Sequence, residues 1–253
     1  MPPRRSLPPV DIVTIPRAEF LAYYWNYRPG DMVTVLAPYG GGKTVLAFQL
    51  LQATASPELP AVVLVMKPKD KEVSRWTRAM KLLVVRDWPP SRFRQLVLRE
   101  KRPGWVLWPG ETDDPDADDR RHAAIFRRCL RERYRSAGRR NGKPCIVFAD
   151  ETYSLEHEMK LTRDLVRIWT KGRSVGCGLF AASQRPVWIS RWALQAHHLF
   201  LGYDPDRQMQ QRYGEIGGGI DPDVVRDAVS RLREFQFLYL NRQERTMAII
   251  DAS

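Results

Sequence analysis

The segment from Ala37 to Thr44 constrains this chain more than any other part of it. It holds three consecutive glycines followed by lysine and threonine, between a strand-like run at residues 32–36 and a helix-like run at residues 45–51. Glycines let the backbone N–H groups turn towards an anion, because no Cβ stands in the way. A strand, a glycine-rich loop and a helix in this order predict a P-loop, which binds the phosphates of a nucleotide.

The residues of this loop have separate expected roles. We expect Lys43 to reach the β- and γ-phosphates and the Thr44 hydroxyl to complete the shell of a Mg²⁺ ion. The usual pattern opens with glycine, whereas this chain has Ala37. A glycine-rich turn without a ligand is the alternative, and Gly-Lys-Thr between a strand and a helix argues against it. The remaining predicted nucleotide-binding residues are Pro38, Tyr39, Gly40, Gly41 and Gly42.

The composition limits the classes of protein to which the chain can belong. Its 253 residues suit one α/β domain, and its formal net charge of +12 favours a polyanionic partner. No apolar run approaches the roughly 20 residues that span a bilayer, so we expect a cytoplasmic protein without direct membrane insertion. Cys129, Cys145 and Cys177 are widely spaced, which favours reduced thiols over disulfides or zinc ligands. His197 and His198 are expected on opposite faces of a strand.

Short apolar strands alternate with longer helical patterns along the chain. This alternation predicts an α/β fold with a mostly parallel central sheet flanked by helices. A strand at residues 61–66 ends in a basic loop at residues 67–71, on the carboxyl edge where such sheets bind ligands. Two further apolar runs, at residues 235–240 and 246–250, predict a C-terminal β-hairpin.

An acidic loop at residues 111–119 precedes a helical pattern that is rich in arginine. Its apolar stripe is Phe126, Leu130 and Tyr134. Two interpretations of the arginines are open. They form either a solvated helix face partly neutralised by the acidic loop, or a surface that faces DNA or a neighbouring subunit.

A second motif follows the P-loop by about 100 residues, where an apolar strand at residues 144–149 ends in Asp150 and Glu151. In a P-loop ATPase this is the Walker B arrangement, in which Asp150 holds Mg²⁺ and Glu151 polarises the attacking water as a general base. An adjacent Asp-Glu pair also indicates the ATPase branch with an additional strand between the two Walker strands. We expect residues 105–108 to lie within that additional region.

A third element is the strand at residues 177–183, which ends at Gln184. A polar residue at its tip is placed to sense the γ-phosphate. Arg173 comes before the same strand, so we expect it at the opposite edge of the sheet. From there it can reach a neighbouring subunit's nucleotide as an arginine finger in trans. The alternative for Arg173 is an arginine of a surface loop, and Arg185 is a weaker candidate for the same role.

These motifs together resemble the FtsK–HerA superfamily of DNA-pumping ATPases, over roughly residues 30–205. The order is Gly-Lys-Thr, then Asp-Glu, then Gly-Arg-Ser-x-Gly at residues 172–176, then Ser-Gln-Arg-Pro at residues 183–186. The resemblance implies a RecA-like P-loop NTPase fold of the ASCE type, ATP and Mg²⁺ as cofactors, and a homo-oligomeric ring, expected to be a hexamer, around double-stranded DNA. We assign residues 1–29 to a basic, proline-rich N-terminal arm and lead-in, and residues 30–253 to a single motor domain.

A bare motor domain of this size most resembles the ATPases that package viral genomes. We therefore expect an ATP-driven DNA translocase that fills a preformed capsid, partnered by a capsid vertex or portal component, in the host cytoplasm or associated with the virion. The alternatives are a conjugative, plasmid-transfer or nuclease-coupled translocase, and a non-motor P-loop ATPase that acts on protein partners. Residues expected to contact DNA are Lys67, Lys69, Lys71, Arg92 and Arg94.

Overall fold

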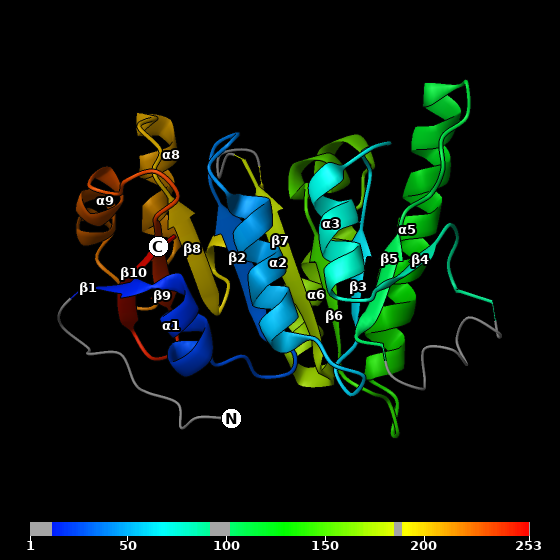
Figure 1. Cartoon of the computed structure of the whole chain (residues 1–253), viewed down its shortest axis with the longest axis horizontal. Coiled ribbons are helices and arrows are strands. Elements are labelled where there is room, and N and C mark those ends of the chain that lie inside the picture. The colour runs from blue at the N-terminus through cyan, green and yellow to red at the C-terminus, as the bar shows by residue number, and fades with distance from the viewer. Residues whose placement is uncertain (1–11, 92–101, 185–188, 253) are drawn as a thin grey trace.

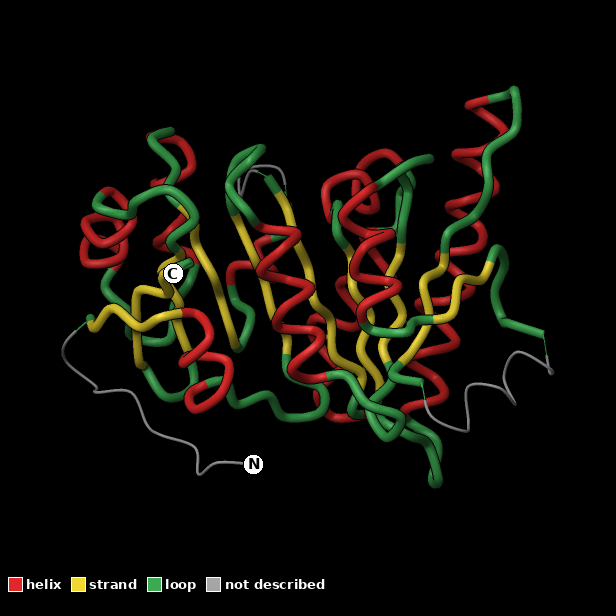
Figure 2. The backbone as a smooth tube through the Cα atoms, in the orientation of Figure 1, coloured by secondary structure: helices red, strands yellow, loops and turns green. Residues whose placement is uncertain are grey.

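A ten-stranded sheet runs through the part of the chain that the structure, a computed structural model, describes, namely residues 12–91, 102–184 and 189–252 (Figures 1 and 2). The strand order is β1-β10-β9-β8-β2-β7-β6-β3-β5-β4. The strands are β1 (Val13–Pro16), β2 (Met32–Leu36), β3 (Ala61–Leu64), β4 (Leu83–Val85), β5 (Gly104–Leu107), β6 (Cys145–Ala149), β7 (Cys177–Ser183), β8 (His198–Gly202), β9 (Phe237–Asn241) and β10 (Thr246–Asp251).

Helices connect these strands and cover both faces of the sheet. The longer α-helices are α2 (Lys43–Thr54), α3 (Lys71–Ala79), α5 (Pro115–Ala137), α6 (Thr162–Val175) and α9 (Pro222–Ser230). The shorter elements are α1 (Arg17–Glu19), η1 (Phe20–Tyr24), η2 (Ser154–Glu158), α7 (Arg191–Leu194), α8 (Arg207–Gln211) and η4 (Arg212–Glu215). None of the described helices combines the length and apolarity needed to cross a bilayer.

Two aspartates fix where the helices on either side of β4 and β5 begin. The carboxylate of Asp70 accepts the N–H of Val73 at 3.0 Å before α3, and that of Asp114 accepts the N–H of Ala117 at 3.0 Å before α5. Pro115 then occupies the first position of α5, where no hydrogen bond from its nitrogen is needed. The helix therefore begins inside the segment that the sequence analysis treated as an acidic loop.

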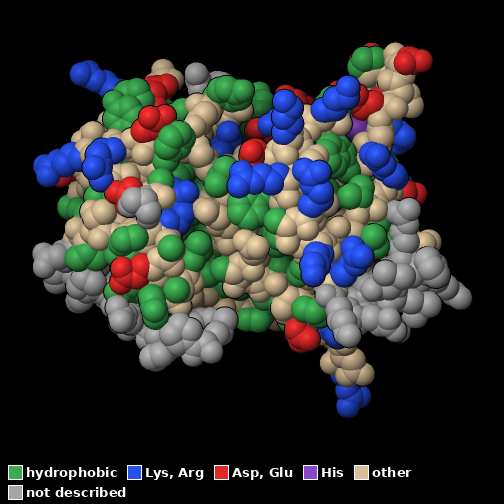
Figure 3. All heavy atoms as spheres, in the orientation of Figure 1, with side chains coloured by type: hydrophobic (Ala, Val, Ile, Leu, Met, Phe, Trp, Pro, Cys, Tyr) green, Lys and Arg blue, Asp and Glu red, His purple; other side chains and the backbone are tan. Residues whose placement is uncertain are grey.

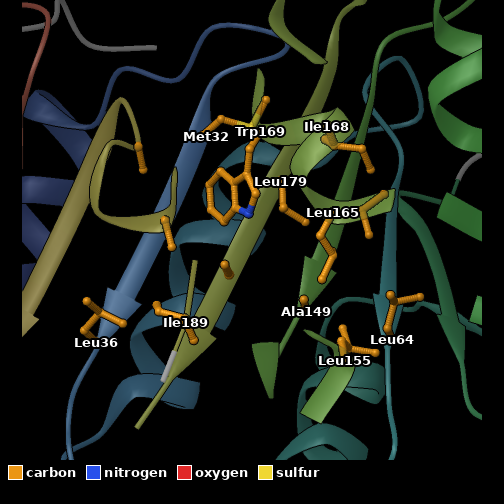
Figure 4. Close-up of a cluster of buried hydrophobic side chains, with 14 of the residues drawn as sticks. Met32, Leu36, Leu64, Ala149, Leu155, Leu165, Ile168, Trp169, Leu179 and Ile189 are labelled. Carbon is orange, nitrogen blue, oxygen red and sulfur yellow. The ribbon is translucent and has the colours of Figure 1, made fainter. Parts of the chain in front are cut away.

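Two apolar layers lie on the two faces of the sheet, because successive strand residues point to opposite faces. In β3, Val62 belongs to the layer closed by α5 and α6, whereas Val63 belongs to the layer closed by α2 and α3. Figure 4 shows the first layer, in which Leu165 and Trp169 of α6 pack with Leu179 of β7. Strands buried on both faces are typical of the centre of a parallel sheet. The predicted α/β fold with a mostly parallel sheet is confirmed.

The predicted C-terminal hairpin is also confirmed, since β9 and β10 pair antiparallel. Its partner on the outer side is β1, which pairs parallel with β10 between Val13 and Pro16. This strand lies within the segment assigned to the N-terminal lead-in, so part of the lead-in belongs to the sheet. The assignment of a boundary at residue 30 stays a prediction.

The strand between the two Walker strands differs from the prediction. Residues 105–108 were expected there, but β5 lies beyond β3, away from β2. The strand between β2 and β6 is β7, which pairs parallel with both. All seven residues of β7 are buried, and the chain returns to the centre of the sheet through α6 after β6. A continuous apolar run at residues 177–183 is the sequence signal for that central position.

The two adjacent histidines do not diverge as predicted. His197 precedes β8 and is not part of it, so the alternation of a strand does not apply. Nδ1 of His197 lies 3.9 Å from Asp31, and Nε2 of His198 lies 3.4 Å from the same carboxylate. No group of three or more metal-ligating side chains occurs in the described parts of the chain. The three cysteines are free and buried.

Candidate nucleotide site

The P-loop after β2 uses its three glycines in two ways. Gly40 and Gly42 both have φ of +78°, a backbone conformation that side chains rarely allow. Gly41 is needed for space, since a Cβ there would lie 3.0 Å from the Cβ of Ala37. The N–H of Gly41 donates to the carbonyl of Pro38 at 3.1 Å, which closes the turn.

Ala37 fits at the first position of this loop for two reasons. It is not among the described non-glycine residues with positive φ, so its backbone is ordinary. Its buried methyl group lies against Gly202 at the end of β8, where an added Cβ would come within 2.8 Å of it. The neighbouring strand therefore provides the room that the first glycine of the usual pattern would provide.

Lys43 and Thr44 begin α2 directly behind the loop. Lys43 is only 7% exposed, and burial lowers the pKa of its ammonium group, opposed by the carboxylates of Glu151 and Asp150. The hydroxyl of Thr44 donates to Oδ1 of Asp150 at 3.1 Å. The P-loop and the carboxylate pair predicted after β6 thus meet at one edge of the sheet, where a buried ammonium group is placed to neutralise an anion.

Asp150 is buried at 5% exposure beside Glu151. Burial, followed by the charge of Glu151, raises the pKa of Asp150 to about 6. A hydroxyl and a carboxylate are oxygen donors of the kind that Mg²⁺ prefers. A cation held between Thr44 and Asp150 would also stabilise the charged form of this carboxylate. The residues present therefore fit the predicted magnesium site.

Lys67 lies at this site, although the sequence analysis placed it among the DNA contacts. Its Nζ lies 3.2 Å from Oε1 of Glu151 and 3.9 Å from Asp70. Burial alone would lower the pKa of Lys67, but the charge of Glu151 and their hydrogen bond raise it. The indole N–H of Trp108 donates to the Lys67 carbonyl at 2.8 Å and anchors the loop. The sequence signal was the position of Lys67 directly after a buried strand, which places it at the same edge of the sheet as Glu151.

Gln184 follows β7 and lines a cavity of about 540 Å³ together with Glu151 and Lys67. The opposite wall comes from the start of α5, including Asp118 and His122. The predicted sensor and the predicted general base therefore face the same space.

Arg173 lies at the other edge of the sheet, as predicted. It is exposed in the last turn of α6, and a Cβ on Gly30 would come within 2.9 Å of its Cα. Gly30 precedes β2, so Arg173 lies at the amino edge, whereas Asp150 and Glu151 lie at the carboxyl edge. Its role stays a prediction.

Exposed lysines and arginines surround the loop between β3 and α3, and Figure 3 shows basic side chains over this part of the surface. Lys69 and Lys71, two of the predicted DNA contacts, are exposed there. Arg92, Arg94 and Arg185 lie outside the described residues.

The arginines of α5 include several with structural contacts that the sequence analysis did not foresee. Arg131 lies 2.8 Å from Asp164 of α6, and Arg127 lies 3.6 Å from the same carboxylate. Arg133 is a half-buried cation over the rings of Trp88 and Trp105. Part of the arginine-rich face therefore joins α5 to the rest of the domain.

Similar architectures occur among solved protein structures, although the sequence itself has no match. No protein-family model matches the chain, and no curated protein matches its sequence. Similar solved structures include the genome packaging NTPase B204 from Sulfolobus turreted icosahedral virus 2 in complex with AMP, at a TM-score of 0.60 and 15% identity, over 90% of this chain and 100% of that one.

Two further structures are similar. VirB4 of Thermoanaerobacter pseudethanolicus has a TM-score of 0.59 at 10% identity, over 87% of this chain and 88% of that one. EssC (ATPases 2 and 3) from Geobacillus thermodenitrificans has a TM-score of 0.52 at 13% identity, over 95% of this chain and 45% of that one. At these identities the likeness shows the fold, and the predicted P-loop NTPase fold is confirmed.

Proposed function

We propose that this chain is an ATPase of the FtsK–HerA superfamily that hydrolyses Mg-ATP to move double-stranded DNA. The observation that carries the proposal is the 3.1 Å hydrogen bond between Thr44 and Asp150, which joins the P-loop to the carboxylate pair. Glu151 and Gln184 face one cavity beside this contact. The order of motifs in the sequence and the likeness to the packaging NTPase B204 support the same function.

Each residue has a role in the proposed hydrolysis. Lys43 neutralises the β- and γ-phosphates, and the P-loop N–H groups hold their oxygens. Magnesium, held by Thr44 and Asp150, would spread the negative charge of the transferring phosphoryl group. Glu151 accepts the proton of the attacking water, and its ion pair with Lys67 orients the carboxylate. Gln184 contacts the γ-phosphate side of the site.

The assembly is part of the proposal. A homo-oligomeric ring, expected to be a hexamer, would place Arg173 of one subunit against the nucleotide of the next, where it stabilises transition-state charge. Lys69 and Lys71 would face DNA and bind its phosphates, because a motor must pass any base sequence. The proposed setting is packaging of a viral genome into a capsid, with a vertex or portal component as partner, in the host cytoplasm or the virion.

A second candidate belongs to the same class. The order of motifs also fits a conjugative or other DNA-transfer ATPase, and the TM-score to VirB4 is almost the same as that to B204. Both candidates hydrolyse ATP with the same residues and differ in the partner that the ring engages. Capture of a capsid protein by this chain in a pull-down would favour packaging.

Steady-state phosphate release tests the proposed function. We expect magnesium-dependent ATP hydrolysis that long duplex DNA stimulates severalfold. Lys43→Ala serves as the negative control. Its rate of phosphate release with DNA should equal the rate measured without protein. Hydrolysis that duplex DNA leaves unchanged would remove the translocase and favour a P-loop ATPase that acts on a protein partner.

A further inference from the structure

Exposed aromatic side chains gather beside the P-loop. In the described parts of the chain, the large apolar side chains that are exposed are Tyr39 at 88%, Tyr203 at 46%, Phe235 at 43% and Val224 at 40%. The three aromatic ones line a single cavity of about 390 Å³. Single exposed apolar side chains are ordinary on protein surfaces, but aromatic rings that share one cavity indicate a binding site.

Phe235 has a backbone conformation that its side chain disfavours. Its φ is +61°, in the left-handed region that suits glycine, and a bulky residue adopts it only where the surroundings impose it. Its ring lies against the P-loop, since Cδ1 is 3.2 Å from the position of a Cβ on Gly42. Residues held in such conformations cluster at ligand sites.

A buried arginine holds this conformation in place. Arg17, 7% exposed, donates from Nη2 to the carbonyl of Phe235 at 2.6 Å and from Nη1 to Oε1 of Gln49 at 3.3 Å. Its guanidinium also lies over the ring of Phe237, 5.8 Å from the centroid. Since Gln49 belongs to α2, Arg17 ties the position of Phe235 to the helix that begins at the P-loop.

The order of strands decides which end of a nucleotide this cavity faces. On one side of β2 lie β7 and β6, whose tips lead to Gln184 and Glu151. On the other side lies β8, whose tip leads to Tyr203. A triphosphate on the P-loop with its γ-phosphate towards Glu151 therefore directs its nucleoside towards Tyr203 and Phe235.

We infer that Phe235 and Tyr203 form a stacking site for the base of the bound nucleotide, built on the rigid support that Arg17 provides. The inference rests on the proposed function, because it requires phosphates on the P-loop. A cavity of this size suits a nucleoside, and aromatic rings bind any base through its face.

Two ligands separate the base from the phosphates. Isothermal titration calorimetry with AMPPNP reports both parts, whereas inorganic tripolyphosphate lacks the nucleoside. Phe235→Gly removes the ring and keeps the left-handed backbone. It should weaken AMPPNP about tenfold, the size of one stacked base, and leave tripolyphosphate within about twofold. Phe235→Tyr keeps a ring and should stay within about threefold for both ligands.

The controls keep this test independent of folding. Val224→Ala removes an exposed apolar side chain outside the cavity and should change neither affinity. Tyr203→Ala, which leaves residue 235 intact, should weaken AMPPNP about threefold. Unchanged AMPPNP affinity in both ring-deleted variants would overturn the inference, as would parallel loss of tripolyphosphate, which would make the ring a support for the P-loop.

Failure of the proposed function gives a different result. A wild-type chain that binds neither AMPPNP nor tripolyphosphate would remove both the nucleotide site and the base site. Equal affinity of wild type for the two ligands would remove the base site alone.

Discussion

The two edges of the sheet carry different parts of the proposed chemistry. At the carboxyl edge, Lys43, Thr44, Asp150 and Glu151 lie within one network that a single chain assembles. At the amino edge, Arg173 is exposed, and no described carboxylate forms an ion pair with it. In the proposed function, one chain would suffice to bind nucleotide, whereas turnover would need the amino edge of a second copy.

The charged groups at the two edges also respond to pH in opposite directions. Burial and Glu151 raise the pKa of Asp150 to about 6, above its value in an unfolded chain. Burial lowers the pKa of His197 to about 4, although Asp31 opposes this, and Nδ1 of His197 accepts the N–H of Met32 at 2.9 Å. Charge is costly at the nucleotide edge until a ligand arrives, whereas the histidine at the amino edge is held neutral as part of the structure.

The largest expected effect comes from the amino edge. Arg173→Ala should lower ATP turnover by about 10³-fold, the size typical of an arginine finger, without changing AMPPNP affinity. Lys171→Ala, an exposed change in the same helical turn, should have little effect. Phosphate release and calorimetry measure the two quantities. Normal turnover in Arg173→Ala would reduce Arg173 to a surface arginine.

The second largest loss of ATP turnover is expected from a change at the carboxyl edge. Glu151→Gln keeps the size of the side chain and removes the base, so turnover should fall by about 10²-fold while AMPPNP still binds. Glu158→Gln is the matched control, because Glu158 lines the same cavity. If Glu151→Gln turns over ATP normally, another group activates the water.

Asp150→Asn should lower ATP turnover but raise the free energy of unfolding. Removing a buried charge should raise the free energy of unfolding at pH 7.5, without magnesium or nucleotide, by about 3 kcal/mol. The folded state binds the Asp150 proton first, so this gain should vanish as pH falls from about 6 to 4. Urea unfolding at several pH values measures it, and a gain that is independent of pH would contradict the raised pKa.

His197→Gln tests how the stability contributed by the amino edge depends on pH. The unfolded state binds the His197 proton first, so His197 lowers the free energy of unfolding as pH falls from about 6.5 to 4. Relative to wild type, this variant should lose less stability in that window. An identical pH profile for both proteins would contradict the lowered pKa.

The smallest effect tests how the loop accommodates Ala37. Gly202→Ala should destabilise the fold by about 1 kcal/mol, since the two methyl groups would lie too close. Combining it with Ala37→Gly should remove most of the loss. Urea unfolding of the single and double variants measures the coupling. Additive losses would show that the two residues do not share this space.

Local pattern predicted much of the fold. Residues 32–36, 144–149 and 177–183 were recognised as strands because each is an apolar run that leads directly into a motif with a chemical role. The wrong position of residues 105–108 has a physical cause, since strand order depends on which long crossovers pack best across the whole sheet. A local run of apolar residues indicates that a strand is buried on both faces, but it does not identify the strands on either side.

The candidate site was predicted where residues follow one another in motifs, and missed where distant segments meet. The Lys67–Glu151 ion pair depends on β3 lying beside β6, and the packing of Ala37 on Gly202 depends on β8 lying beside β2. Phe235 was placed at the start of the predicted strand at residues 235–240, but β9 begins at Phe237, and the carbonyl of Phe235 in its left-handed conformation accepts a hydrogen bond from Arg17, far along the chain.

Mixing two inactive variants tests the divided site most directly. Lys43→Ala removes the carboxyl-edge half, and Arg173→Ala removes the amino-edge half. We predict that mixed assemblies regain part of the wild-type ATP turnover, because some interfaces combine an intact P-loop with an intact Arg173. Native mass measurement in ATP would establish that mixed assemblies form. Mixed assemblies without any recovered turnover would contradict a site shared between neighbouring subunits.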